Sequence, residues 1–155
     1  MKLLFVCSGN TCRSPLAEAI TRQQAAERGL DLDASSAGIS AWEGAPASDG
    51  ALLVGMEHRA DLGEHRSRQL TREIVDEADL VLVMGPAHLE RVEAMGGKGK
   101  AFLLTDYASR GAAARAISDP YGGDLDTYRA TYEELASAIR QVLDRVEAER
   151  PRNAS

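Results

Sequence analysis

Residues 2–20, KLLFVCSGNTCRSPLAEAI, decide the fold of this chain. The apolar run at 2–6 predicts a short buried strand, because uninterrupted apolar runs of this length are typical of parallel sheets. A polar loop follows, and a helical pattern begins at Ser14 and Pro15, which suit an N-cap and the first helical position. A strand, a short loop and a helix in succession predict the opening unit of a parallel α/β sheet.

The rest of the chain continues this alternation of strands and helices. The first helix is expected to extend to about Arg28 and to end at Gly29. A last helix at 125–148 carries apolar side chains every three or four residues, which is typical of a face packed on a core, although a coiled coil would show the same spacing. Further strands are expected at 33–37, 78–85 and 101–104, and further helices at 47–60 and 86–95.

The composition is that of one soluble domain. The chain has 155 residues, 44% hydrophobic and 27% charged, and its element order predicts a single α/β domain over 1–150, with a parallel sheet covered by helices on both faces and a disordered tail at 151–155. The net charge of −6 argues against nucleic acid or an anionic membrane as a partner. No run reaches transmembrane length, the N-terminal apolar run is too short for a signal peptide, and two cysteines make no secreted disulfide framework. We therefore expect a cytoplasmic protein.

The loop at 7–13 has the composition of an oxyanion-binding site. Ligands of parallel sheets bind beyond the carboxyl ends of the strands, and Cys7 stands at that end of the first strand. Glycine in the loop allows close approach of a ligand, and asparagine tolerates a left-handed backbone. The positive end of the following helix would strengthen an anion-binding nest made by the backbone N–H groups of Ser8, Gly9, Asn10, Thr11 and Cys12.

Cys7 and Arg13 give this loop its predicted chemistry. A guanidinium can hold two oxygens of a tetrahedral oxyanion, and a thiolate beside a bound phosphate is a nucleophile in line with phosphorus. The positive field is expected to lower the pKa of the Cys7 thiol. Alternatively, Cys7 is a structural core residue and Arg13 a surface residue, but the C-x5-R spacing between a strand and a helix favours a phosphoryl site. The loop lacks the nucleotide-binding G-x4-GK[ST] pattern, and GGKGK at 96–100 is expected to be a turn.

Four motifs resemble, in the same order, the landmarks of the low-molecular-weight protein phosphatase family. They are VCSGNTCRSPLAE at 6–18, SAG at 36–38, ADLVLVM at 78–84 and DPYGG at 119–123, and the resemblance covers about residues 2–147. It implies a four-stranded parallel sheet of the flavodoxin-like type. It also implies a protein phosphatase that needs no metal or cofactor, acts on a phosphorylated protein through a phosphocysteine intermediate, and releases inorganic phosphate.

The resemblance also assigns roles to individual residues. It implies Cys7 as the nucleophile, Arg13 as the phosphate ligand and Asp119 as the general acid. Spacing alone could not choose this acid from among Asp106, Asp119, Asp124 and Asp126. Ser14 has two predicted roles that can coexist, capping the helix or hydrogen bonding to the Cys7 sulfur. Ordinary surface or partly buried roles are expected for His58, His65 and His88.

Thr11 and Tyr121 bear on the choice of substrate. Phosphotyrosine-cleaving members of the family typically carry a bulky aliphatic residue in place of Thr11, and often two adjacent aromatics after Asp-Pro, where this chain has Tyr121 followed by two glycines. One aromatic wall and a small polar lip suit a guanidinium better than a phenol ring. The chain therefore resembles the protein-arginine phosphatase branch. Phosphotyrosine, other phosphoesters and arsenate reduction stay open as alternatives, as does a non-catalytic phosphate-binding module.

Two further expectations concern regulation and assembly. Cys7 and Cys12 lie in one curled loop, so they are expected to form a protective disulfide after oxidation; the alternative is that Cys12 only packs the loop. The chain is expected to be a monomer or a weak dimer.

Overall fold

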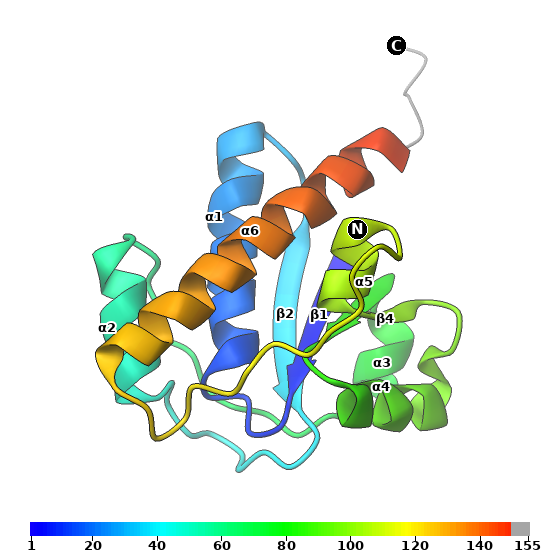
Figure 1. The fold of residues 1–155 in the computed structure, drawn as a ribbon. Coiled ribbons are helices and arrows are strands. Elements are labelled where there is room, and N and C mark those ends of the chain that lie inside the picture. The colour runs from blue at the N-terminus through cyan, green and yellow to red at the C-terminus, as the bar shows by residue number, and fades with distance from the viewer. Residues whose placement is uncertain (150–155) are drawn as a thin grey trace.

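Four parallel strands form the centre of the structure, a computed structural model that describes residues 1–149 (Figure 1). The strands are β1 (Lys2–Cys7), β2 (Asp33–Gly38), β3 (Leu80–Val83) and β4 (Ala101–Leu103), in the order β2-β1-β3-β4. Cys7 pairs with Gly38 of β2, and Val6 pairs with Val83 of β3, so the carboxyl ends of these strands meet at one edge of the sheet. The predicted four-stranded parallel sheet is confirmed, and Cys7 lies at its predicted end of the central strand β1.

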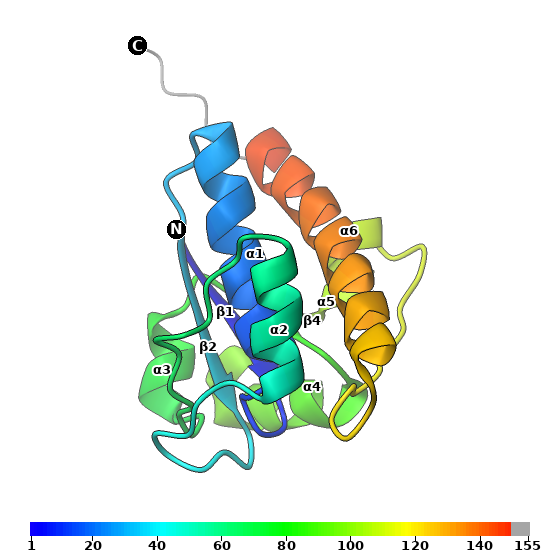
Figure 2. The same cartoon turned by 90° about the vertical axis from the view of Figure 1, so that its left-hand side faces the viewer.

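Helices cover both faces of the sheet, as predicted. Leu3 and Phe5 belong to one core, with residues of α1, α2, α5 and α6, whereas Leu4 and Val6 belong to a second core, with residues of α3 and α4. Figure 2 shows α1 and α6 next to each other on the first face. The helices are α1 (Arg13–Arg28), α2 (Asp49–Glu57), α3 (Arg72–Glu77), α4 (Pro86–Val92), α5 (Leu104–Ser109) and α6 (Leu125–Glu149), with a π-helical turn, η1 (Glu93–Gly97), after α4.

The helices differ from the sequence predictions mainly in length and number. The helix predicted at 47–60 is shorter in the structure, where it is α2; Ser48 caps its start by accepting the N–H of Ala51, and His58 is its C-cap residue. The short helices α3 and α5 were not predicted, since six residues are too few to show a helical periodicity. α6 packs on α1 and α5, so its apolar stripe is a core face and not a coiled-coil seam.

The start of α1 departs from the prediction. The helix begins at Arg13, with Cys12 at the N-cap position and no side-chain cap, so Pro15 is the third helical residue and Ser14 is not the cap. Gly29 ends α1 in the left-handed conformation, as predicted. The Ser14 hydroxyl instead has the second of its predicted roles, the contact with the Cys7 sulfur, described below. The end of the predicted domain at residue 150 and the predicted tail at 151–155 lie outside the described residues.

No helix within residues 1–149 is long and apolar enough to cross a membrane.

Candidate active site

Asn10 is the turning point of the loop between β1 and α1. Its φ of 58° lies in the left-handed region, as the sequence predicted, and the residue is fully buried. His65 Nε2 donates to the Asn10 carbonyl at 2.7 Å, and the backbone N–H of Arg68 donates to Asn10 Oδ1 at 3.0 Å. Asn10 Nδ2 in turn donates to Ser14 Oγ at 2.8 Å. Asn10 is therefore fixed from the 61–68 segment on one side and fixes Ser14 on the other.

Ser14 holds the thiol of Cys7. Ser14 Oγ lies 2.8 Å from Cys7 Sγ, and both residues are buried. Ser14 Oγ accepts a hydrogen from Asn10 and keeps its own hydroxyl hydrogen, which it can donate to a Cys7 thiolate. The second of the two predicted roles of Ser14 is the one that the structure contains.

The predicted lowering of the Cys7 pKa is wrong in this structure. Burial, the largest influence, raises the pKa of the Cys7 thiol, because a thiolate loses hydration inside the protein. The Ser14 hydrogen bond, the backbone amides of Ser14 and Asn10, and the charge of Arg13 all act to lower it, but they do not outweigh burial. The sequence revealed the positive field and did not reveal how deeply the sulfur lies.

Arg13 and Asp119 meet beside the loop. The Arg13 side chain is buried, and its Nη1 donates to the Ile117 carbonyl at 2.9 Å. Its Nη2 lies 3.7 Å from Asp119 Oδ2. Asp119 is half-exposed, and its Oδ1 accepts the backbone N–H of Tyr121 at 3.1 Å. Arg13 thus anchors the segment that carries Asp119, although the two residues are far apart in the sequence.

A cavity of about 360 Å³ opens over the loop and brings the three predicted catalytic residues together. Of the four candidate acids, Asp119 is the one in its lining. Asp124 instead accepts the N–H and the hydroxyl of Thr127 at the start of α6, and Asp126 pairs with Arg129. The lining residues are Cys7, Gly9, Thr11, Cys12, Arg13, Ser40, Trp42, Asp119 and Tyr121.

Three predicted phosphate-binding residues do not line the cavity. The side chains of Asn10 and Ser14 bond within its wall, as described above, and Ser8 Oγ lies 2.9 Å from His88 Nε2. The backbone N–H groups of Ser8 and Asn10 stay predicted ligands of the phosphate.

Trp42 and Ser40 are lining residues that the sequence reasoning missed. Trp42 and Tyr121 are strongly exposed and come from two separate loops of the chain. The prediction of one aromatic wall is therefore wrong, because the second aromatic side chain comes from the segment after β2 and not from the residue after Tyr121.

Two of the three histidines also contact the loop, contrary to the expectation of ordinary roles. His65 bonds to Asn10 and His88 to Ser8. His58, in contrast, stacks on Tyr132 with ring centroids 3.8 Å apart. A signal for His88 was present in the sequence, since it follows β3 closely and therefore lies at the same edge of the sheet as Cys7.

Cys12 belongs to the loop, and its sulfur lies in a cluster of polar atoms. Its sulfur lies 3.2 Å from Ser48 Oγ and 3.4 Å from the Tyr128 hydroxyl. Burial, followed by the hydrogen bond with Cys12, raises the pKa of Tyr128 to about 12. Both cysteines are free thiols, so a disulfide between Cys7 and Cys12 stays a prediction.

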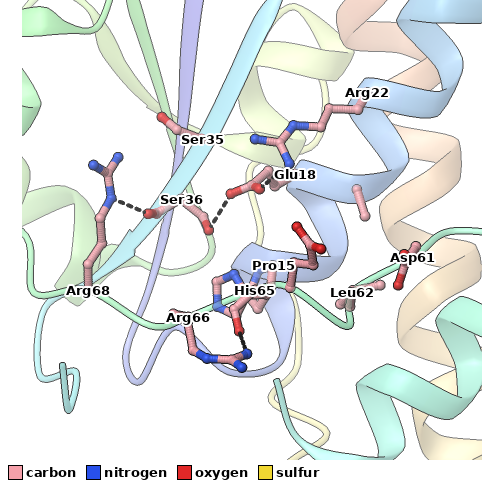
Figure 3. A pocket seen from close by; sticks show the side chains of 12 residues that line it. Pro15, Glu18, Arg22, Ser35, Ser36, Asp61, Leu62, His65, Arg66 and Arg68 are labelled. Carbon is pink, nitrogen blue, oxygen red and sulfur yellow. Dashed lines mark hydrogen bonds and ion pairs between the residues drawn. The ribbon is translucent and has the colours of Figure 1, made fainter. Parts of the chain in front are cut away.

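A second cavity, of about 400 Å³, lies between α1, β2 and the 61–68 segment (Figure 3). Several polar and charged side chains that line this cavity form hydrogen bonds and ion pairs with other lining residues. Glu18 accepts from Ser36 and pairs with Arg22, and Arg68 Nε donates to the Ser36 carbonyl. This cavity has no cysteine in its lining, and its bonds anchor the segment whose His65 and Arg68 fix Asn10.

Within residues 1–149, no group of three or more His, Cys, Asp or Glu side chains is placed to hold a metal ion. The groups that face the main cavity are a thiol, a guanidinium and a carboxyl, and they are suited to nucleophilic attack, oxyanion binding and proton transfer.

Residues 2–152 match the low molecular weight phosphotyrosine protein phosphatase family. The chain belongs to this family. Relatives of this low molecular weight phosphatase are named either arginine phosphatases or tyrosine phosphatases. It is 36% identical over 152 residues to the protein-arginine-phosphatase of Bacillus subtilis, covering 97% of this chain and 99% of the relative. It is 45% identical over 144 residues to the probable low molecular weight protein-tyrosine-phosphatase EpsP of Ralstonia solanacearum, covering 92% and 90%.

A solved structure supports the same assignment of the fold. YwlE arginine phosphatase, as a mutant with a phosphorylated active-site serine, superposes with a TM-score of 0.91 at 35% identity, covering 97% of this chain and 98% of that one. The family resemblance stated from the four motifs is thereby confirmed. This chain is a low molecular weight protein phosphatase.

Proposed function

We propose that this phosphatase removes the phosphoryl group from phosphoarginine in proteins. The observation that carries the proposal is Thr11, a small polar residue in the lining of a cavity that also contains Cys7, Arg13 and Asp119. A guanidinium is planar and branched, and a small hydroxyl-bearing side chain leaves it space beside the phosphate. The similarity to two protein-arginine-phosphatases, from Bacillus subtilis and Geobacillus stearothermophilus, supports this substrate.

The geometry suits a reaction in two steps. In the first, Cys7 Sγ attacks phosphorus while Arg13 and the loop amides hold the phosphoryl oxygens, and the bond from phosphorus to the guanidine nitrogen breaks. Asp119 gives its proton to the departing nitrogen. In the second step water attacks the phosphocysteine, Asp119 takes a proton from that water, and inorganic phosphate leaves Cys7 as a thiolate.

Phosphotyrosine is the second candidate substrate, and Trp42 favours it. With Tyr121 it provides two exposed aromatic side chains at the cavity, which suit a phenol ring better than the single wall expected from the sequence. The 45% identity to EpsP supports this alternative as well.

One comparison of substrates tests the proposal. Matched peptides with phosphoarginine or phosphotyrosine at the same position are hydrolysed side by side, and kcat/KM is expected to be larger for phosphoarginine. A larger value for phosphotyrosine would replace the proposed substrate. The same assay with Cys7→Ser separates an enzyme from a phosphate-binding module: turnover should vanish, while inorganic phosphate or vanadate should still bind.

The remaining expectations belong to this proposal. The substrate is a phosphorylated protein and the product is inorganic phosphate, without a metal, another cofactor, nucleic acid or a membrane as partner. We infer a cytoplasmic location and a monomer or weak dimer.

A further inference from the structure

His88 is a buried histidine that the proposed reaction does not use. It lies in α4 and is 5% exposed. Its Nε2 lies 2.9 Å from Ser8 Oγ, in the loop that carries Cys7 and Arg13. Its Nδ1 has no hydrogen-bond partner within residues 1–149 and faces Gly85, at which an added Cβ would lie 3.6 Å away. One ring nitrogen is thus bonded to the phosphate-binding loop and the other is buried without a partner.

This asymmetry decides which nitrogen carries the proton. A neutral imidazole has one N–H and one lone pair. A buried N–H without a partner costs more than an acceptor atom without one, and such orphaned donors are rare in proteins. The hydrogen therefore belongs on Nε2, where it points to Ser8 Oγ, and the lone pair belongs on Nδ1.

Burial, more than the charges around His88, keeps the ring neutral. Burial lowers the pKa of His88 to about 4, and the positive charge of Arg13 adds to this effect. Asp119 acts in the opposite direction and is outweighed. At neutral pH the ring is thus uncharged, so Nε2 donates one hydrogen bond and Nδ1 donates none.

Ser8 is held from two sides by these contacts. Its Oγ is hydrogen bonded to His88 Nε2, and its carbonyl accepts the backbone N–H of Ser40 at 2.9 Å. Its neighbours Cys7 and Gly9 both line the cavity, so any movement of Ser8 displaces the nucleophile and the loop backbone that faces the phosphate.

We propose that His88 is a positioning residue of this phosphatase: as a neutral donor from Nε2 to Ser8 Oγ, it fixes the first turn of the phosphate-binding loop between α4 and the segment that contains Ser40. The proposal rests on the proposed phosphatase function of that loop. It assigns His88 no contact with the substrate, and its effect on catalysis passes through Ser8.

The first test reads the proton position without using activity. Long-range ¹H–¹⁵N spectra of uniformly labelled protein are recorded from about pH 5 to about pH 8, the interval in which an ordinary histidine titrates. The His88 signals are assigned by their loss in His88→Gln. We expect a proton on Nε2, none on Nδ1, and no titration. A proton on Nδ1, or a ring that titrates in this interval, would overturn the proposal even in a fully active enzyme.

The second test asks whether His88 acts through Ser8. The readouts are kcat/KM for an aryl phosphate and the inhibition constant of inorganic phosphate. His88→Leu should weaken both about tenfold, the value of roughly one buried hydrogen bond. His88→Gln keeps an N–H donor of similar reach and should stay within about threefold of the wild type. In a Ser8→Ala background, His88→Leu should cost less than about threefold, because the bond is already absent.

If His88→Leu weakens both readouts by the same factor in the wild type and in the Ser8→Ala background, the proposal is overturned, since His88 would then act through packing and not through Ser8. His58→Gln is the matched control, because His58 stacks on Tyr132 and does not bond to the loop; it should leave both readouts unchanged. If His88→Leu does not fold, His88→Asn, whose shorter side chain cannot reach Ser8, takes its place. A wild type that cleaves aryl phosphate and not phosphoarginine refutes the proposed substrate and leaves this test intact.

Discussion

Ser14 Oγ lies 2.8 Å from Cys7 Sγ and also accepts a hydrogen from Asn10 Nδ2. When Cys7 is a thiolate, the Ser14 hydroxyl is the donor of this bond, because the sulfur then has no hydrogen. This hydrogen bond stabilises the thiolate more than the thiol, so it lowers the pKa of Cys7 against the effect of burial. The thiolate is the form that attacks phosphorus. Ser14 therefore sets how much of the nucleophile is ready at a given pH.

Ser14→Ala should raise the pKa of Cys7 further. A group that stabilises the charged form is lost, so the thiolate appears at higher pH and its fraction at neutral pH falls. We expect alkylation of Cys7 by iodoacetamide to slow about tenfold at neutral pH, and its pH profile to move to higher pH. Ser35→Ala in β2, outside the lining of the cavity that contains Cys7, is the matched control and should leave the profile in place. An unchanged profile in Ser14→Ala would show that Ser14 does not tune the thiol.

Asp119→Asn should affect the two kinds of substrate unequally. A guanidine that leaves without a proton is far less stable than a phenolate, since the reference pKa values are about 12.5–13.8 and about 10. We expect kcat on a phosphoarginine peptide to fall by about 10²-fold or more, and on nitrophenyl phosphate by less than about tenfold.

Asp124→Asn is the control for this prediction. Asn caps a helix as well as Asp does, so the start of α6 should be preserved and both rates should stay near those of the wild type. Equal losses on the two substrates in Asp119→Asn would indicate that Asp119 only positions Arg13.

Cys12 is expected to protect the nucleophile from irreversible oxidation. Peroxide should convert Cys7 to a sulfenic acid, which Cys12 can capture as a disulfide before further oxidation. Activity of the wild type should therefore return fully with dithiothreitol, whereas Cys12→Ser should recover only a small part. Mass spectrometry of the unreduced protein should find a Cys7–Cys12 link. Equal recovery in both proteins would leave Cys12 as a packing residue between Ser48 and Tyr128.

The sheet could be predicted because its strands carry their own signal. β3 and the part of β1 after Lys2 are uninterrupted apolar runs, and each strand is followed closely by a helix. The short helices α3 and α5 carry no such signal, since their burial depends on neighbours that are distant in the sequence. Local patterns thus predicted the layers of the fold and not every element in them.

The residues of the site also fall into those that local sequence patterns predict and those that they do not. Cys7 and Arg13 could be found from the sequence because they lie at the two ends of one short loop, Cys7 at the end of β1 and Arg13 at the start of α1. Trp42 and His88 reach the loop only after the sheet has brought distant segments together. No local pattern marks Trp42, and the position of His88 shortly after β3 is its one signal in the sequence. The direction of the Cys7 pKa was missed for the same reason, because burial is a property of the folded chain.

Thr11 should select phosphoarginine through the size of its side chain. Thr11 lines the cavity, and its carbonyl accepts the backbone N–H of Ser48 at 2.9 Å, so the loop backbone is anchored independently of the side chain. Thr11→Ile keeps the branch at Cβ and adds a methylene that crowds a branched guanidinium and offers apolar contact to a phenol ring. One methylene in a pocket changes discrimination by roughly 10–200-fold. The ratio of kcat/KM for matched peptides should therefore shift toward phosphotyrosine by at least about tenfold.

Thr11→Val separates size from polarity, because valine has nearly the shape of threonine and lacks its hydroxyl. If size decides, Thr11→Val should keep the ratio of the wild type and Thr11→Ile alone should change it. If the hydroxyl decides, both variants should shift toward phosphotyrosine by similar factors. Alkylation of Cys7 should proceed at the same rate in all three proteins, since neither substitution touches Ser14. A ratio that is unchanged in both variants would remove Thr11 from the selection of substrate and leave Trp42 and Tyr121 as the residues that favour phosphotyrosine.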